Sequence, residues 1–281
     1  MKAILFKCTF LFSLSGLLIG CNTESKMFSE NDIQFDSLFV EKTFLFFDED
    51  TSPTCSLQIN FVYPVNFSNK DILKQIQLQF VSDFFGDQYA GLTPNEAAEN
   101  YTDNFIQTCK EVENDFKTEL ENHDMNIEEM WYVIEESTTN RIIFNCNDLI
   151  SFVVSKAYYF GGAHGGHNYE NRVIDLKTGR RITEDAIFAD DYQDDLTKII
   201  IDAIALSNNV EIAELENIGF FNLDEIYPNN NFYADETGLT YIYNEYEIAA
   251  YVVGAVSVQI PYEKIRHLFR RESPVSDLAF R

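Results

Sequence analysis

The stretch that decides the fold is residues 173–182, which read Val-Ile-Asp-Leu-Lys-Thr-Gly-Arg-Arg-Ile. Two short apolar runs flank a turn that contains Gly179, and this arrangement predicts an antiparallel β-hairpin. Strict alternation of strands with helices would instead indicate a parallel sheet. The hairpin therefore favours an α+β fold.

Two helices are predicted on the N-terminal side of this hairpin. Apolar residues recur at helical spacing between Asn69, a typical helix cap, and Gly86, a typical helix stop. The sequence Thr93-Pro94-Asn95-Glu96 combines a cap, a proline in the first turn and the acidic partner of a capping box. An apolar stripe then continues to Leu120, so we expect a second, longer helix.

Runs of β-forming residues surround these helices, and a third helix is expected over 196–204. We expect Pro64 to end the first of these strands. Together the elements predict an α+β protein of two closely packed units, each an antiparallel sheet with helices on one face. We place the units at 32–165 and 166–281. The predicted strands cover residues 54–63, 130–135, 141–146, 149–160, 231–233, 239–243 and 256–261.

The chain begins with a segment typical of a secretory signal. Lys2 and Lys7 accompany an apolar run over 10–20, which is shorter than the roughly 20 residues of a membrane-spanning helix. The run ends in Leu18-Ile19-Gly20-Cys21, which resembles a bacterial lipobox. We expect residues 1–20 to be a signal peptide, Cys21 to carry the lipid that anchors the protein to a membrane, and 21–31 to be a polar tether.

This segment also predicts the compartment. A lipidated protein with such a signal is extracytoplasmic and attached to the cell envelope. An aspartate directly after the lipidated cysteine resembles an inner-membrane retention signal, and Asn22 stands there instead. We therefore expect the outer membrane.

Acidic residues outnumber basic residues by more than two to one. Forty-six Asp and Glu against 20 Lys and Arg give a net charge of −26, which becomes −28 without Lys2 and Lys7. This sign disfavours nucleic acid as a partner and favours a cationic one. The 25 Phe and 15 Tyr residues indicate a folded chain, because disordered chains contain few aromatics.

Three cysteines would remain in the body of the mature protein, namely Cys55, Cys109 and Cys146. An odd number in an oxidising compartment leaves two alternatives open: one disulfide with one buried thiol, or three buried thiols. No C-x-x-C pair is present, so the sequence offers no support for redox or zinc-ribbon chemistry.

A glycine cluster at 161–166 is the first place to look for a site. We interpret Gly161, Gly162, His164 and Gly165 as a structural turn in which backbones approach closely. One alternative is a metal site whose ligands are His164 and His167 together with Glu170 and Asp175. Another is an enzyme or glycan-binding site that uses His164, Glu170 and Asp175. Sequences that would indicate a serine hydrolase, a nucleotide-phosphate loop or a zinc protease are missing. We expect no catalytic residues, no metal and no cofactor.

Residues 158–165 and 173–180 also carry a family resemblance. They resemble the junction of a paired extracytoplasmic module formed by the domains of unknown function 4163 and 3298. Such pairs occur in bacterial lipoproteins of unknown function, in the outer region of the lysozyme-sensing anti-sigma factor RsiV, and beside a peptidoglycan deacetylase. Further similar stretches extend the resemblance from about Thr54 to Leu268, and they are residues 84–87, 93–97, 224–228 and 241–251.

Because catalytic signatures are missing, we expect a binding protein that is not an enzyme. The resemblance and the negative charge make a cationic lysozyme-like protein the concrete candidate ligand. In the family, the segment at 243–251 reads Y-N-P-Y-E-I-A-P-Y, and Glu245 and Ala250 stand here in place of its prolines. The candidate ligand-binding residues are Tyr243, Tyr246, Glu247 and Tyr251, as exposed aromatics and an acid that suit an interface.

Other interpretations stay open. Core and turn packing is the alternative for these four residues. For the whole protein, the alternatives are an enzyme or binding module that acts on peptidoglycan or another glycan, and a structural envelope lipoprotein.

Overall fold

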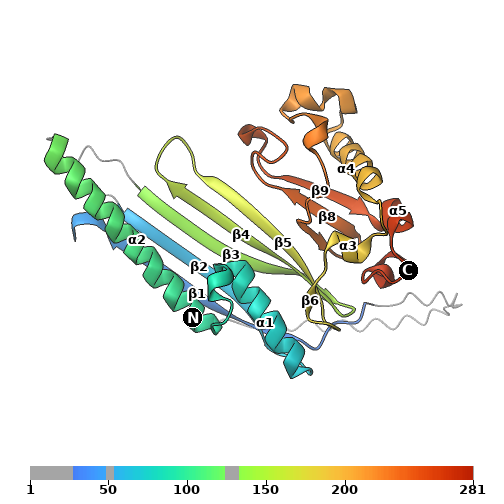
Figure 1. Cartoon of the computed structure of the whole chain (residues 1–281), viewed down its shortest axis with the longest axis horizontal. Coiled ribbons are helices and arrows are strands. Elements are labelled where there is room, and N and C mark those ends of the chain that lie inside the picture. The colour runs from blue at the N-terminus through green and yellow to red at the C-terminus, as the bar shows by residue number, and fades with distance from the viewer. Residues whose placement is uncertain (1–27, 49–53, 124–132, 281) are drawn as a thin grey trace, which may run out of the picture.

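The structure is a computed structural model that describes residues 28–48, 54–123 and 133–280. It contains a six-stranded sheet of order β1-β2-β3-β4-β5-β6 and a three-stranded sheet of order β7-β8-β9, with helices packed on both (Figure 1). The predicted α+β class is confirmed. The predicted signal peptide and Cys21 lie outside the described residues.

The larger sheet and its helices form the N-terminal part of the fold. Helices α1 and α2 follow each other between β2 and β3, and short 3-10 turns lie beside them. The bounds are β1 (Gln34–Leu45), β2 (Thr54–Asn66), α1 (Lys70–Phe85), α2 (Pro94–His123), β3 (Val133–Cys146), β4 (Leu149–Phe160), β5 (Gly166–Asp175) and β6 (Arg180–Arg181).

The smaller sheet and its helices form the C-terminal part. Helix α4 is the longest helix here, and η4 is a 3-10 segment that follows it. The bounds are α3 (Glu184–Ile187), α4 (Gln193–Asn208), η4 (Ile212–Ile218), β7 (Phe232–Ala234), β8 (Gly238–Tyr243), β9 (Val256–Pro261), α5 (Tyr262–Ile265) and α6 (Ser276–Ala279).

Side-chain caps start the two long helices where the sequence predicts them. The Asn69 side chain accepts hydrogen bonds from the backbone N–H groups of Asp71 and Ile72, at 3.2 Å each. The Glu96 carboxylate accepts from the backbone N–H and the hydroxyl of Thr93, at 2.9 and 2.8 Å. These bonds satisfy N–H groups that the first turn of a helix otherwise leaves unpaired.

The larger sheet is not antiparallel throughout, which corrects one prediction. β2 and β3 pair in parallel from Thr54↔Val133 to Asn60↔Thr139. The reason is the crossover, because α1 and α2 carry the chain back so that it enters β3 in the direction of β2. The pairing of β2 with β3 ends at Asn60, so Pro64, which has no backbone N–H, does not have to donate a hydrogen bond to β3. β2 continues through Pro64 to Asn66, and the predicted strand end is wrong.

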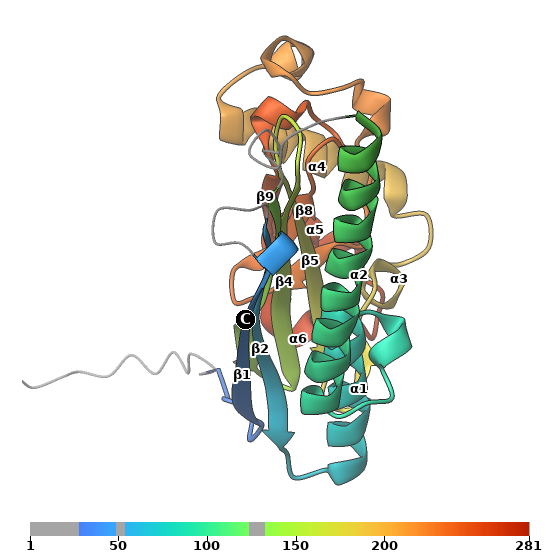
Figure 2. The same cartoon turned by 90° about the vertical axis from the view of Figure 1, so that its left-hand side faces the viewer.

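The two helices cover one face of the larger sheet and leave the other face open (Figure 2). Aromatic side chains fill the space between them. Phe80 of α1 stacks on Phe152 of β4 with ring centroids 4.2 Å apart, and Phe84 lies 4.5 Å from Phe61 of β2. α4 packs on the smaller sheet through its apolar stripe, which includes Leu196 and Ile200. The predicted helices on one face of each sheet are thus present.

Side-chain amides join the two sheets along β5. The Asn231 amide accepts from the backbone N–H of Asn171 at 2.7 Å and donates to the carbonyl of Tyr169 at 2.9 Å. Asn244 accepts from the backbone N–H of Tyr169 at 2.7 Å. These bonds satisfy backbone groups on the edge of β5 that faces away from β4. On that edge the two-residue strand β6 pairs only with Ile174 and Asp175.

The predicted unit boundary after residue 165 falls inside the larger sheet. β4 and β5 pair from Leu149↔Asp175 to Tyr158↔Gly166. Strand pairing holds β5 in the first unit although its far end packs into the core of the second, to which Leu149 and Val173 both contribute.

The last residues of the predicted tether contact the folded body. The backbone N–H of Ser29 donates to Asn147 at 2.9 Å, and the Asn31 amide donates to the carbonyl of Leu149 at 2.9 Å. Across the parts of the chain that the structure describes, no helix combines the length and the apolar character needed to cross a membrane.

Candidate functional site

Residues from two separate sequence motifs meet at the tip of the β4–β5 hairpin. His164 of the glycine cluster stacks on Tyr251, with ring centroids 4.0 Å apart and planes 22° apart. Tyr251 in turn stacks on Tyr246 at 5.6 Å and 26°. The Tyr251 hydroxyl donates to the carbonyl of Gly165 at 3.0 Å. We call His164, Tyr251 and Tyr246 the aromatic ladder.

Backbone conformation sets the position of the ladder. Gly162 has a φ of 94°, which side chains rarely allow. A Cβ on Gly165 would lie 2.6 Å from the carbonyl oxygen of Tyr158, so only glycine fits there. Tyr246 has a φ of 65°, uncommon for a residue with a side chain. The Tyr246 side chain is 57% exposed.

Two of the four predicted ligand-binding residues make contacts within the fold. Tyr243 is only 1% exposed, so the expectation that it is an exposed aromatic is wrong. It belongs to β8, and its hydroxyl donates to the carbonyl of Tyr227 at 2.8 Å. The half-buried Glu247 accepts from the Asn229 amide at 2.7 Å and from the backbone N–H of Asn244 at 2.8 Å. It stabilises the turn that presents Tyr246.

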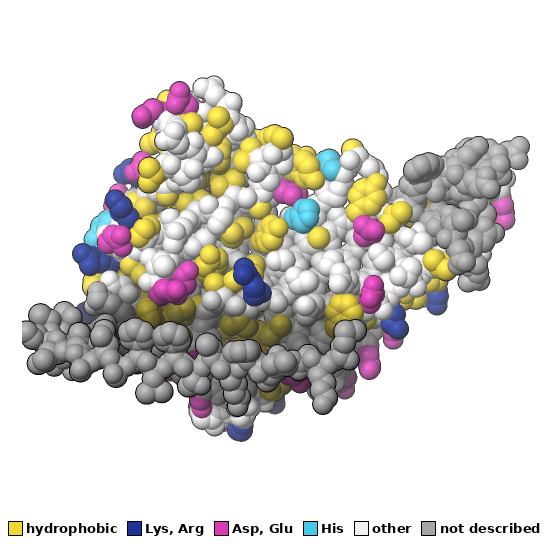
Figure 3. Space-filling view, turned by 180° about the vertical axis from the view of Figure 1, so that it is seen from behind, with side chains coloured by type: hydrophobic (Ala, Val, Ile, Leu, Met, Phe, Trp, Pro, Cys, Tyr) yellow, Lys and Arg dark blue, Asp and Glu magenta, His cyan; other side chains and the backbone are white. Residues whose placement is uncertain are grey.

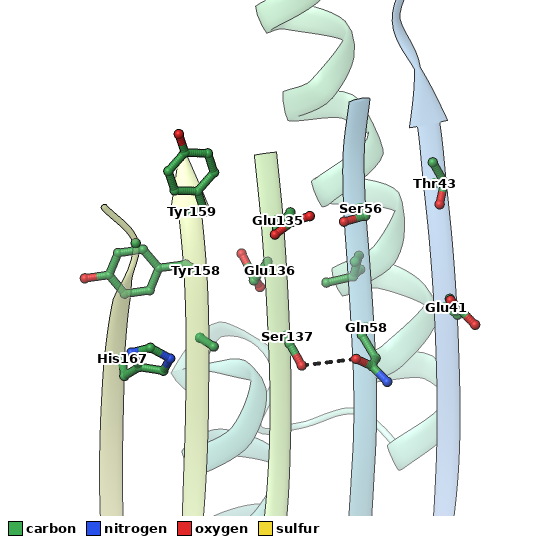
Figure 4. A pocket seen from close by; sticks show the side chains of 13 residues that line it. Glu41, Thr43, Ser56, Gln58, Glu135, Glu136, Ser137, Tyr158, Tyr159 and His167 are labelled. Atoms are coloured by element: carbon green, nitrogen blue, oxygen red, sulfur yellow. Dashed lines mark hydrogen bonds between the residues drawn. The ribbon is translucent and has the colours of Figure 1, made fainter. Parts of the chain in front are cut away.

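A hollow of about 540 Å³ adjoins the ladder on the open face of the larger sheet (Figures 3 and 4). We call it the polar trough. Side chains of neighbouring strands cross it in two rows set by the strand register. One row contains Thr43, Ser56, Glu135 and Tyr159, and the other contains Glu41, Gln58, Ser137, Ala157 and His167.

The trough and the ladder are connected through Glu245. Its carboxylate accepts from the backbone N–H of His167 at 3.2 Å, and its second oxygen lies 3.2 Å from Nδ1 of the His167 ring. Gly165 lines the trough and also accepts the hydrogen bond from Tyr251. The two features therefore form one continuous surface.

The charge of this surface is acidic. Glu41 and Glu135 line the trough, and Glu245 lies at its edge. The described residues that line the trough include one histidine, His167, and no lysine or arginine. Sequence reasoning missed the trough, because its side chains come from five strands and adjoin only after the sheet has formed.

The alternative site of His164, Glu170 and Asp175 is not formed. His164 belongs to the ladder, and Glu170 pairs with Arg172 at 2.5 Å. Asp175 lies at the far end of β5, where it accepts from the Thr178 hydroxyl at 2.8 Å. A strand rises by roughly 3.3 Å per residue, so the length of β5 separates His164, which precedes the strand, from Asp175 at its end. In the described ranges no three His, Cys, Asp or Glu side chains form a metal-binding group.

Two family models match separate parts of the chain. A model described as "Deacetylase PdaC" matches residues 49–167. A model described as "Protein of unknown function (DUF3298)" matches residues 185–263, which confirms the expected resemblance to domain 3298. No curated protein matches the chain significantly.

Solved structures share the architecture. A DUF3298 family member from Bacteroides fragilis is 27% identical, with a TM-score of 0.82 over 90% of this chain and 99% of that one. A DUF3298 family protein from Pseudomonas aeruginosa is 12% identical, with a TM-score of 0.57 over 86% of this chain and 96% of that one, a likeness of fold alone. The chain thus contains a region similar to the PdaC model followed by a region similar to the DUF3298 model, in a fold also seen in the Bacteroides fragilis protein.

Proposed function

We propose that the chain is a lipid-anchored extracytoplasmic binding protein whose ligand is a cationic protein, with a lysozyme-like hydrolase as the concrete candidate. The observation that carries the proposal is the continuous surface of the aromatic ladder and the polar trough. It presents an exposed tyrosine beside several carboxylates, and no lysine or arginine lines the trough.

This combination suits recognition of a basic protein. Tyrosine is enriched among the residues that dominate binding energy at protein interfaces. Acidic groups around it attract a positively charged partner and orient its approach. The whole chain adds to the attraction through its net charge of −26.

The proposed membrane anchor is the lipid on Cys21, at the end of the lipobox-like sequence. Acyl chains on this cysteine would hold the folded body at a membrane surface. The described fold supports this arrangement, because β1 begins at Gln34, shortly after the predicted tether. Mass spectrometry of the protein from its native cells tests it: the N-terminal peptide should start at Cys21 and carry the mass of acyl chains. An unmodified peptide that starts at Met1 would refute the anchor.

The binding surface is tested with matched variants. Tyr246→Ala should weaken the affinity for lysozyme about tenfold or more, as expected for an interface anchor. Tyr227→Ala is the control, because Tyr227 is 58% exposed and lies outside the ladder. Equal affinities of the two variants would contradict the proposed surface.

A charge reversal tests the trough separately. Glu135→Lys should reduce the association rate with lysozyme several-fold, because it places a positive charge on the steered surface. Glu216→Lys changes the net charge by the same amount from an exposed position in η4. If both reversals slow association equally, only the net charge matters and the trough has no specific role.

A peptidoglycan- or glycan-directed role is the second candidate. The hydroxyl and amide side chains of Thr43, Ser56, Gln58 and Ser137 beside Tyr159 are groups that can hydrogen-bond a sugar. Binding of peptidoglycan fragments at low salt, without binding of lysozyme, would favour this role over the first.

A further inference from the structure

Helix α2 covers one face of the larger sheet (Figure 2). On this side, a second cavity is lined by residues of α2, β3 and β4. It has a volume of about 420 Å³, within the range of ligand pockets. We call it the α2 pocket. Its wall is largely apolar and includes Tyr89, Tyr101, Phe105, Ile134 and Phe160.

Glu136 is the one charged side chain among the described residues that line the α2 pocket. It is half-buried, and it accepts a hydrogen bond from the Tyr101 hydroxyl. Within the described parts of the chain it has no ion pair with a lysine, arginine or histidine. A carboxylate held in apolar surroundings without a cation gains more from a cationic partner than one in open water.

Tyr101 keeps this carboxylate in place. Burial and the neighbouring Glu136 carboxylate both raise the pKa of the Tyr101 hydroxyl, which therefore stays protonated and donates its hydrogen. Tyr101 also packs against Tyr89, with ring centroids 5.7 Å apart. Tyr101 on α2 thus donates a hydrogen bond to one carboxylate oxygen of Glu136, and the carboxylate still lines the α2 pocket.

An exposed aromatic pair flanks the carboxylate. Phe160 is 50% exposed and stacks on Tyr158, with ring centroids 5.3 Å and planes 23° apart. Tyr158 is paired with Glu136 across β3 and β4. Aromatic faces attract organic cations, and they also bury the alkyl stems that carry them. The pocket therefore offers a carboxylate, aromatic rings and apolar walls together.

We propose that the α2 pocket binds an alkylammonium or alkylguanidinium group, with the cationic head at Glu136 and the alkyl stem against Phe105 and Phe160. Such a group could be a free polyamine-type molecule or a lysine or arginine side chain of a protein. The protein source rests on the proposed function, whereas the free amine does not.

Titration calorimetry of the full chain with agmatine and cadaverine tests the chemistry. The uncharged control is 1,5-pentanediol, which matches the length of cadaverine. Both amines should bind, and the diol should bind at least about tenfold more weakly, because it lacks the charge that Glu136 recognises. Equal affinity for the diol and cadaverine would overturn the proposal.

Variants then locate the site. Glu136→Gln keeps an acceptor for Tyr101 and should weaken amine binding about tenfold, whereas Glu216→Gln on the surface of η4 should not. Phe160→Ala should weaken it several-fold, whereas Phe39→Ala, which removes a 58% exposed ring from β1, should not. Thermal melts confirm that each variant is folded. Amine binding that survives both Glu136→Gln and Phe160→Ala would place it elsewhere and refute the proposal.

The lysozyme assay distinguishes the two sources. If Glu136→Gln weakens lysozyme binding and agmatine competes with it, the pocket receives a protein side chain. If agmatine binding depends on Glu136 and lysozyme binding does not, or lysozyme does not bind at all, the pocket receives a free amine and the proposal stands. If the amines do not bind and Glu136→Gln leaves lysozyme binding unchanged, the proposal fails while the proposed function remains.

Discussion

A buried carboxyl at the start of α3 ties this helix to the smaller sheet. Glu184 accepts from the backbone N–H of Asn230 at 2.8 Å and from the Tyr192 hydroxyl at 3.0 Å. Burial raises the pKa of the Glu184 carboxyl, and these hydrogen bonds offset only part of the effect. The folded protein therefore holds the proton of Glu184 to a higher pH than the unfolded chain does.

This residue predicts a pH dependence of stability. Between about pH 4.3, the ordinary glutamate pKa, and the raised pKa, the folded state binds more protons, so its stability falls as pH rises. Glu184→Gln removes this titration. Relative to the wild type, the variant should therefore gain free energy of unfolding as pH rises through that window. Urea unfolding at a series of pH values measures it, and parallel curves for the two proteins would contradict the prediction.

The three described cysteines should differ in reactivity. Cys55 and Cys109 are buried, and Cys146 is half-buried. The neighbouring Cys109 thiol and burial raise the pKa of Cys55, so its reactive thiolate is scarce. Native alkylation with iodoacetamide, followed by peptide mass spectrometry, should modify Cys146 first. Modification of Cys55 at the rate of Cys146 would show that this core is more open than the structure has it.

Single residues were predictable where the rule is local. Asn69 and Glu96 cap their helices as expected, because a cap acts within three residues of its own position. Tyr243 was mispredicted, because its burial depends on β9 and on Tyr227. The contact of His164 with Tyr251 could not be predicted from either motif alone, since it forms only after both sheets are in place.

At the scale of elements, periodicity identified the helices and most strands, while pairing partners stayed hidden. The hairpin at 173–182 is present as β5 and β6. β1 was not predicted, because an edge strand with one neighbour carries no clean alternation of buried and exposed residues. The parallel pair of β2 and β3 depends on where α1 and α2 return the chain.

The packing of α1 on the larger sheet can be measured. Phe80 is fully buried against Phe152, so Phe80→Ala should lower the free energy of unfolding by about 3–5 kcal/mol. Leu78→Ala on the same helix is the control, because Leu78 is an exposed hydrophobic residue and should cost about 1 kcal/mol or less. Urea unfolding measures both. Similar losses for the two variants would show that α1 is not held by this aromatic contact.

At the scale of the whole molecule, Asn231 connects the two sheets through two hydrogen bonds to β5. Its removal leaves the backbone N–H of the buried Asn171 without its partner. Asn231→Ala should lower the free energy of unfolding by about 1–3 kcal/mol, the cost of an unsatisfied buried group. The control is Asn222→Ala, which removes a cap from an exposed 3-10 turn.

Hydrogen exchange gives the same test a local readout. The backbone N–H of Asn171 should exchange faster in Asn231→Ala, because this variant removes its hydrogen bond. Its exchange rate should not change in Asn222→Ala, which leaves that bond in place. Unchanged protection of Asn171 in both variants would mean that the sheets are held together without this amide.

The central claim is that an acidic surface with an exposed tyrosine binds a basic protein. Its most direct test is the affinity of the purified protein for lysozyme and for lysozyme whose lysines have been acetylated, each over a salt series. We predict binding of unmodified lysozyme that weakens at least about tenfold between low and physiological salt, with acetylated lysozyme binding far more weakly, because screening and charge removal act on the same attraction. Equal binding of both forms, independent of salt, would contradict the claim.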